Sequence, residues 1–361
     1  MTSHPAAGAS QRDYGTLADG RAVQQVTLSN GRGLVLTAIT LGGIVTTLEV
    51  PDRHGQRANI VRGFDELADY VARNPFFGVI VGRYGNRIAR GELVIAGETF
   101  ELAHNDGLNC LHGGKNGFGT RLWEIESLRE HDAALGGPAV TLRFTSPDGD
   151  EGFPGQLEAR VTYSLGADQS WRIAYEATTD RATVVNLTHH DYFNLAGSGA
   201  IHDHLLTLPA SRYNPIDAAL IPTGIDAVEG TPFDFRSPTR IGLRVHADDA
   251  QLKLAGGYDH NWIIDAPVDG GPRLAALLED PASGRTMAVL STEPAIQFYS
   301  GNFLDGTLRG TGGEVYERGA ALCLETQHSP DSPHHADWPS TLLRPGETYR
   351  SETVHRFGVA I

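Results

Sequence analysis

Hydrophobic and polar residues alternate with a period of two along much of this chain, as they do in half-buried strands. Residues 26–36 alternate in this way on both sides of Asn30-Gly31, and Asn-Gly supplies the positive φ angles of a tight hairpin turn. Residues 93–102 predict a second hairpin around Ala96-Gly97. Further strands are expected at residues 139–145, 157–165, 171–178, 286–290 and 321–324.

Helical spacing is rare by comparison. Leu67, Tyr70 and Val71 recur at helical intervals and predict one short helix within residues 65–73. Many strands with so little helix predict an all-β fold, a large antiparallel β-sandwich with few short helices. Residues 1–12 are expected to be a disordered leader. No linker or low-complexity segment interrupts residues 13–361, so they are expected to form a single domain.

The charge balance narrows the classes of partner. The chain has 29 basic and 44 acidic residues, a net charge of −15, which argues against binding to nucleic acid or to an anionic membrane. It contains no apolar run of ~20 residues and no apolar segment near its start, so neither a membrane span nor a secretory signal is expected. Its two cysteines, Cys110 and Cys323, make no disulfide framework and suit the reducing cytoplasm.

Short clusters of polar, titratable and aromatic residues interrupt the apolar pattern, mostly at the end of a strand or within one. Buried polar groups are costly unless they are paired, and a purely structural sandwich does not need so many of them. For any one cluster alone, satisfaction by the backbone at a sheet end is the simpler explanation. The clusters are GRYGNRI at residues 82–88, LHGG at 111–114, NLTHHDYFNLAG at 186–197, YDHNW at 258–262, QFYSGNFL at 297–304 and LETQH at 324–328.

In this order, the clusters make the chain resemble the aldose 1-epimerases, also called galactose mutarotases. SPDGDEGFPG at residues 146–155, IPTG at 221–224 and LLRPGE at 342–347 extend the resemblance, which runs from about residue 12 to residue 361. It implies a large twisted β-sandwich whose concave face holds a sugar. The implied activity is an isomerase that interconverts the α and β anomers of free hexoses such as galactose and glucose, without metal or cofactor. We expect a monomer or a homodimer.

The resemblance also assigns the site. The histidine of NLTxHxYFNL that is the acid of the family falls on His190, and the glutamate of LETQ that is the base falls on Glu325. The residues that bind the sugar fall on Asn86, Arg87, His112, Tyr192, Asp259 and Gln297.

The residues on either side of His190 depart from the usual pattern of the family. The position before it is commonly Asn and is His189 here, and the position after it is commonly Ser or Thr and is Asp191 here. In a strand both side chains face away from His190, so the chemistry is expected to survive. A nearby Asp191 carboxylate would favour the charged form of His190, and a protonated His189 would oppose it.

Anomer exchange explains why an acid and a base are needed together. One group protonates the ring oxygen, and the other takes the proton of the C1 hydroxyl. The open aldehyde then rotates about C1–C2 and recloses with the roles reversed. Histidine, with an ordinary pKa of ~6.5, suits such transfers, whereas glutamate at ~4.3 is a weaker base unless its surroundings raise the value.

Alternative functions would use some of the same residues. A non-catalytic sugar-binding module needs no acid–base pair, and a phosphosugar epimerase would need additional Arg or Lys. A glycoside hydrolase would pair Asp259 with Glu325 at a separation of about 5–9.5 Å. Glu325 alone could be the ion-pair partner of Arg87. A metal site could draw on residues 189–191 and 202–204, although their spacing is not that of known zinc motifs.

Overall fold

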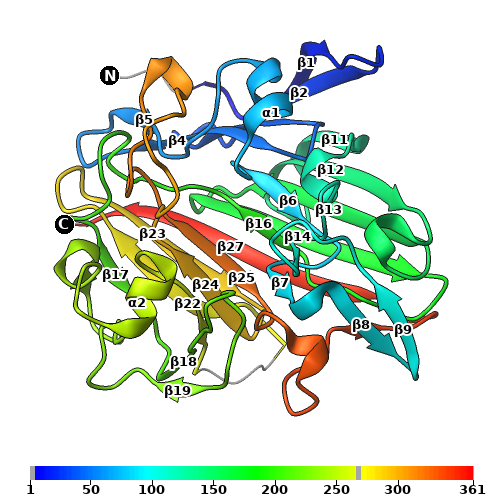
Figure 1. The fold of residues 1–361 in the computed structure, drawn as a ribbon. Helices are drawn as coiled ribbons and strands as arrows, with labels where there is room; N and C mark the ends of the chain where they lie inside the picture. The colour runs from blue at the N-terminus through cyan, green and yellow to red at the C-terminus, as the bar shows by residue number, and fades with distance from the viewer. Residues whose placement is uncertain (1–4, 266–269, 361) are drawn as a thin grey trace.

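The largest sheet has nine antiparallel strands, in which the period of two separates an apolar face from a polar one. In β13, Val161 and Tyr163 are buried, whereas Arg160 and Thr162 between them are only half-buried and lie on the opposite face. The computed structural model describes residues 5–265 and 270–360. In spatial order the strands are β11 (Glu124–Asp132), β12 (Gly137–Ser146), β13 (Leu157–Leu165), β14 (Ser170–Thr179), β27 (Tyr349–Val359), β23 (Arg285–Ser291), β22 (Arg273–Glu279), β17 (Leu205–Thr207) and β20 (Thr239–Arg240) (Figure 1).

Two five-stranded sheets accompany it. The first comprises β1 (Gly8–Thr16), β2 (Ala22–Ser29), β3 (Val35–Ile39), β4 (Val45–Pro51) and β5 (Arg57–Asn59). The second comprises β19 (Asp226–Ala227), β18 (Arg212–Asn214), β21 (Asp259–Ile263), β24 (Ala295–Tyr299) and β25 (Cys323–Gln327). Two-stranded pairs complete the strand set, namely β7 (Arg87–Ile88) with β10 (Cys110–Leu111), β6 (Val79–Val81) with β16 (Thr188–His190), β8 (Glu92–Ile95) with β9 (Glu98–Glu101), and β15 (Thr183–Val184) with β26 (Leu342–Leu343).

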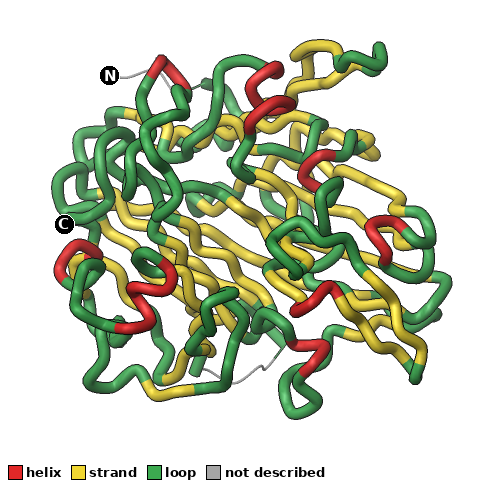
Figure 2. Tube along the Cα trace, in the orientation of Figure 1, coloured by secondary structure: helices red, strands yellow, loops and turns green. Residues whose placement is uncertain are grey.

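Helix is scarce, as Figure 2 shows, and the all-β expectation is confirmed. Within the described residues the α-helices are α1 (Leu67–Arg73), which lies inside the predicted segment 65–73, and α2 (Ala250–Ala255). No described helix has the length and apolar character that crossing a membrane would require. Single turns of 3-10 helix lie at Ala89–Gly91, Phe118–Thr120, Asp150–Gly152, Ile241–Leu243, Thr311–Gly313 and Ser332–His334.

The two predicted hairpins differ in their turns. Ala96 and Gly97 both have positive φ, 51° and 82°, and Ile95 pairs directly with Glu98, as a two-residue turn requires. The tight turn predicted at Asn30-Gly31 is wrong, because residues 30–34 all lie in the connection between β2 and β3. The side chain of Asn30 explains this longer loop, since its Oδ1 accepts the backbone N–H of Arg32 and of Leu34.

The start of the chain also differs from expectation. A disordered leader was predicted for residues 1–12, but β1 begins at Gly8 and pairs with β2 from Gly8–Ser29 to Thr16–Ala22. Without β1, the edge of β2 would present unpaired backbone N–H and C=O groups, and backbone pairing satisfies them even where the added strand is polar. Residues 1–4 lie outside the described part. The single-domain organisation of residues 13–361 stays a prediction.

Three short strands meet where the sheets approach each other. β16 pairs with β6 and also packs against β25. β25 and its neighbour β24 are buried along their whole length, yet they contain Gln297 and Glu325. Alternation places Phe298 and Leu324 in the main hydrophobic core, so Gln297 and Glu325 point to the opposite side, toward β16.

Candidate active site

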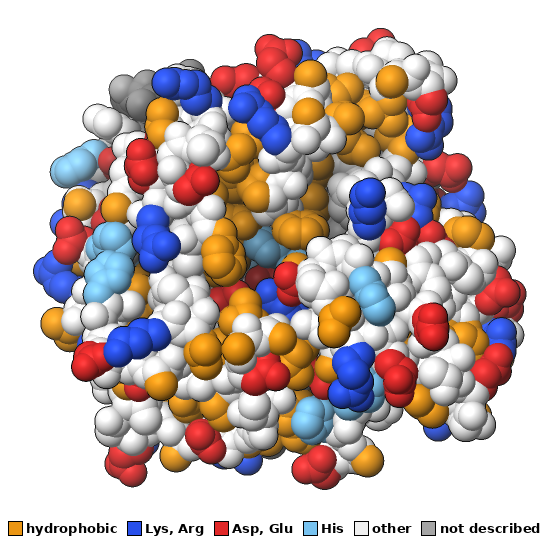
Figure 3. Space-filling model, viewed as in Figure 1, with side chains coloured by type: hydrophobic (Ala, Val, Ile, Leu, Met, Phe, Trp, Pro, Cys, Tyr) orange, Lys and Arg blue, Asp and Glu red, His pale blue; other side chains and the backbone are white. Residues whose placement is uncertain are grey.

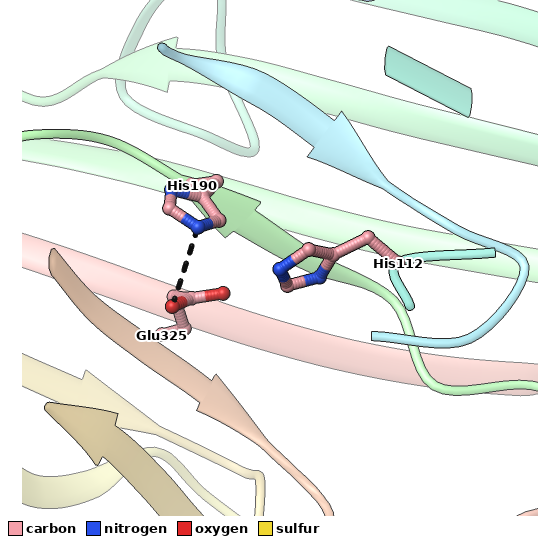
Figure 4. Close-up of side chains that lie close together, drawn as sticks. All are labelled: His112, His190 and Glu325. Atoms are coloured by element: carbon pink, nitrogen blue, oxygen red, sulfur yellow. Dashed lines mark ion pairs between the residues drawn. The ribbon is translucent and has the colours of Figure 1, made fainter. Parts of the chain in front are cut away.

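Three side chains from three elements converge on one point. Nε2 of His190, on β16, lies 3.7 Å from Oε1 of Glu325, on β25 (Figure 4). His112 follows β10, and its ring centroid is 5.1 Å from that of His190. One polar atom from each of the three residues lies within 4.8 Å of the others. All three residues are buried, so the structure brings the predicted acid and base together with one predicted sugar-binding residue.

The register of β24 and β25 sets the floor of the site. Gln297 lies directly opposite Glu325 in the antiparallel ladder, and Nε2 of Gln297 donates to Oδ1 of Asp259 at 2.7 Å. Oε1 of Gln297 and Oε2 of Glu325 are buried and have no hydrogen-bond partner within the described residues. Unused buried acceptors are rare in proteins, and these two are placed to receive hydroxyl groups of a ligand.

The loop around His112 determines the protonation of that ring. Asn86 and His112 both have positive φ, 65° and 51°, and the His112 N–H donates to the Asn86 carbonyl. In return, the Asn86 N–H donates to Nδ1 of His112 at 3.2 Å. Nδ1 therefore has no proton, and Nε2 carries it. Burial holds the pKa of His112 well below its ordinary value, so the ring is a neutral donor through Nε2–H.

Arg87 is fixed from outside the pocket. Its Nε donates to Oδ2 of Asp106 at 2.8 Å and forms an ion pair with that carboxylate. The sequence had suggested Glu325 as the ion-pair partner of Arg87. The guanidinium nevertheless lies close enough to Glu325 and Asp259 to lower the pKa of both carboxyl groups. Arg87 therefore supplies a positive charge to the site, held in place by an acidic partner.

Aromatic rings enclose the acid. Phe76 stacks on the His190 ring with centroids 5.6 Å apart, and Tyr192 stacks on it at 5.1 Å. The Tyr192 hydroxyl donates to the carbonyl of Pro75, so the ring rather than the hydroxyl faces the site. Phe76 has a positive φ of 70° and also packs against His112 at 4.8 Å. These contacts exclude water around His190.

Burial shifts the acid and the base in opposite directions. It lowers the pKa of His190 to about 3 and raises the pKa of Glu325 well above its ordinary value. The charge of Asp259 adds to the rise at Glu325. Both shifts favour the neutral forms, an imidazole on His190 and a protonated carboxyl on Glu325.

A metal ion does not fit this cluster, although His112, His190 and Glu325 are the kinds of ligand that metals take. A metal on His112 would need the lone pair of Nε2, but the Asn86 N–H assigns the ring proton to that nitrogen. Metal-bound histidines ordinarily donate, rather than accept, at their other nitrogen. In the described part of the chain this is the one group of such ligands that lies together, so residues 189–191 and 202–204 do not assemble a metal site.

The cluster lies in a hollow of the surface. Figure 3 shows hydrophobic side chains along its walls, and histidine, acidic and basic side chains at its bottom. A cavity of about 470 Å³ extends from His112 and Phe76 toward α1, while His190 and Glu325 are not part of its lining. The mixture of apolar walls and a polar bottom suits a small ligand with both kinds of surface, such as a sugar.

Residues that sequence reasoning did not place in the site also contribute. Phe76, Asp106 and Pro75 contact the predicted residues, and the sequence signal for them is weak beyond their position in loops next to strands. Cys323 and Glu325 lie on the same side of β25, and Sγ of Cys323 is 3.5 Å from Nδ1 of His190. Arg83 is structural, because its guanidinium donates to Ser146 and to nearby carbonyls.

Known proteins share both this sequence and this fold. The family model described as Aldose 1-epimerase matches residues 24–356. Galactose mutarotase of Mus musculus is 43% identical over 330 residues, which cover 91% of this chain and 92% of that protein. Aldose 1-epimerase of Escherichia coli (strain K12) is 40% identical over 94% of this chain and 96% of that protein.

Among solved structures, galactose 1-epimerase from Lactobacillus acidophilus matches with a TM-score of 0.86 and 27% identity, covering 98% of this chain and 99% of that one. The family match spans the segments that carry Asn86, His190 and Glu325. With a family model that matches most of the chain and relatives of this identity along nearly its whole length, the protein belongs to the aldose 1-epimerase family.

Proposed function

We propose that His190 and Glu325 interconvert the α and β anomers of free hexoses such as galactose and glucose. The observation that carries this proposal is the approach of His190 Nε2 to Glu325 Oε1 at 3.7 Å, beside a Glu325 Oε2 that has no hydrogen-bond partner within the described residues. A gap of this size leaves both atoms free to contact neighbouring atoms of one sugar, the ring oxygen and the C1 hydroxyl.

In this proposal the pair shares one proton, which passes from Glu325 to His190 before the ring opens. Ring opening then starts with that proton on His190 and a charged Glu325. His190 gives its proton to the ring oxygen, and Glu325 takes the proton of the C1 hydroxyl. Both groups end neutral, the form that burial favours, while the aldehyde rotates about C1–C2. Reclosure on the other face returns both protons along the same two paths, so no net proton is consumed.

The remaining residues bind the sugar in this proposal. Arg87 and the Nε2–H of His112 stabilise negative charge that develops on the sugar oxygens. Asn86, Asp259 and Gln297 supply hydrogen bonds to other hydroxyls, and Tyr192 supports the His190 ring. Arg87 also lowers the pKa of Glu325, so it favours the charged form from which ring opening begins.

Polarimetry tests the proposal directly. Fresh α-galactose and α-glucose are followed in buffer with and without the purified protein, and the protein is expected to accelerate the decay of optical rotation for both sugars. His190→Ala and Glu325→Ala should each remove most of this acceleration while the circular dichroism spectrum stays that of a folded β protein. A wild-type decay equal to that of buffer would falsify the proposal. The 6-phosphates, run in parallel, test the phosphosugar alternative.

The cellular setting follows from the thiols. Cys110 and Cys323 are both free and buried, which supports the cytoplasmic location expected from the sequence.

A further inference from the structure

The histidine next to His190 has a partner at each ring nitrogen. Nδ1 of His189 lies 2.7 Å from Oδ2 of Asp191, and Nε2 lies 2.8 Å from the hydroxyl oxygen of Tyr163. That hydroxyl also donates to the carbonyl of Gly43 at 2.7 Å. The side chains of His189 and Asp191 are 3% and 1% exposed, so water does not complete this set of hydrogen bonds from outside.

Counting the protons in this set of hydrogen bonds assigns a charge to His189. A hydroxyl has one proton, and a carbonyl oxygen cannot donate, so the proton of Tyr163 points to Gly43. The Tyr163 oxygen must then accept from His189, which places a proton on Nε2. A second proton lies between Nδ1 and the Asp191 carboxylate, and an imidazole ordinarily holds it more tightly than a carboxylate does. These contacts are the ones that an imidazolium makes with a carboxylate and a hydroxyl oxygen.

The pair ties the short strand β16 to the large sheet. β16 has three residues, and its ladder partner is β6 on one side. Because alternate residues face opposite ways, His189 points toward β13 and the β3–β4 turn, whereas His190 points into the site. The bonds from His189 to Tyr163 and Asp191 fix how β16 is rotated about its own axis. That rotation sets the direction of the His190 ring.

The pair also reaches the base electrostatically. Oδ1 of Asp191 has no hydrogen-bond partner within the described residues, so its charge is only partly neutralised by His189. Asp191 raises the pKa of Glu325, in the same direction as Asp259 on β21 and against Arg87 on β7. The other titratable groups that face the acid and the base are His112 beyond β10, Cys323 on β25 and Tyr192 beyond β16. On the far side, His355 of β27 and Tyr175 of β14 face Asp191.

We propose that His189 and Asp191 form a buried imidazolium–carboxylate brace that positions His190 for proton transfer and keeps Glu325 basic. Both are positioning residues, because neither side chain faces the sugar. The inference rests on the proposed roles of His190 and Glu325, and it adds a second charged layer behind them. Tyr163 belongs to the brace as the acceptor for Nε2 of His189.

Nitrogen NMR of protein labelled with ¹⁵N-histidine tests the charge. At pH 8 an ordinary histidine is neutral, since its pKa is ~6.5. His189, identified by the signals that vanish in His189→Asn, is expected to show both ring nitrogens protonated at pH 8. A neutral His189 at that pH would overturn the inference, whether or not the protein accelerates mutarotation.

Kinetics test the positioning role. Asp191→Asn and Tyr163→Phe are each expected to lower kcat about 10- to 100-fold, with little change in KM, because a misdirected His190 still leaves the sugar contacts intact. Tyr213→Phe is the matched control. Tyr213 is a buried tyrosine on β18 whose charged neighbours are Asp226 and Asp249 rather than the brace, and its kcat should equal that of the wild type.

Outcomes separate the two proposals. An inactive wild type contradicts the proposed function, whereas an active wild type with fully active Asp191→Asn and Tyr163→Phe contradicts the brace. Tyr163→Phe keeps the test decisive if Asp191→Asn does not fold. Removing the charge of Asp191 should also lower the pKa of Glu325 and move the alkaline limb of the kcat–pH profile to lower pH. A fall in kcat with that limb unmoved overturns the electrostatic role.

Discussion

His189 and His190 are neighbours in the chain and equally buried, at 5% exposure each, yet their surroundings differ completely. His189 has a hydrogen-bond partner within 2.8 Å at both ring nitrogens. Among the side chains that the structure describes, the ring nitrogens of His190 lie near the thiol of Cys323 at 3.5 Å and the carboxyl of Glu325 at 3.7 Å. Buried polar groups are ordinarily satisfied by the protein itself. The incomplete set around His190 marks the side of β16 that is open to a substrate.

On the face of β16 that carries His190, Glu325→Gln should cause the largest loss of activity. It keeps the shape of the side chain but removes the base, so kcat is expected to fall on the order of 10³-fold in the polarimetric assay. Glu293→Gln is the matched control. Glu293 is equally buried but satisfied, with His328 at 2.7 Å and the Tyr349 hydroxyl at 3.0 Å. That variant should lose about 1–3 kcal/mol of stability and keep its kcat. Equal kcat values for the two variants would remove Glu325 from the mechanism.

Arg87→Met should weaken binding on the same side. It removes a guanidinium that Asp106 holds at 2.8 Å beside the carboxyl groups of the site, so KM is expected to rise on the order of 10- to 100-fold. Initial rates over a range of galactose concentrations measure this. Arg160→Met, on the outer face of β13, is the control and should leave KM unchanged. An unchanged KM in Arg87→Met would place the sugar elsewhere.

Cys323→Ala should have a smaller effect. The thiol is buried and protonated, since burial raises its pKa well above the ordinary value, and it is the contact of His190 Nδ1. Losing it frees the ring to rotate, and we expect kcat to fall by about twofold to tenfold, within the range of one weak hydrogen bond. Cys110→Ala removes the other buried thiol away from His190, and it should leave kcat unchanged. An equal loss in both variants would indicate general destabilisation.

The pH profile should show the smallest change of all. The pKa of His190 is lowered to about 3, so this ring gains an additional proton only as the pH falls toward that value. The pKa of Glu325 is raised, so the pair keeps its single proton until the pH exceeds that raised value. Enzymatic mutarotation should therefore stay flat from pH 5 up to the raised pKa of Glu325. A limb centred near pH 6.5, where an ordinary histidine titrates, would contradict the neutral pair.

Local patterns predicted the strands because strand periodicity depends on neighbouring residues. The segment 157–165 is β13, and the turn at Ala96-Gly97 has the φ angles that its sequence favours. The failures have non-local causes. β1 forms from a polar segment because β2 offers it a backbone edge, and the loop after β2 is longer because the Asn30 side chain bonds to later N–H groups.

The site was predictable as a set of residues but not as a geometry. The motifs named His190, Glu325 and His112, and these do converge. No motif indicated that Phe76 stacks on His190 or that Asp106 holds Arg87. Both contacts join segments that are separated in the chain, and the Phe76 contact also depends on an uncommon backbone angle. The local spacing of residues therefore could not predict them.

By itself, the sequence determined the all-β class and the positions of most strands, and it named His190 and Glu325 as the proposed acid–base pair. It also showed that His189 and Asp191 face away from His190, because side chains alternate along a strand. Only the tertiary structure decided which side chains contact β16 on each of its two faces. It brought Glu325 of β25 to His190, and it brought Tyr163 of β13 to His189. Burial and hydrogen bonding set the charge of each group, and both depend on neighbours that the fold supplies from distant parts of the chain.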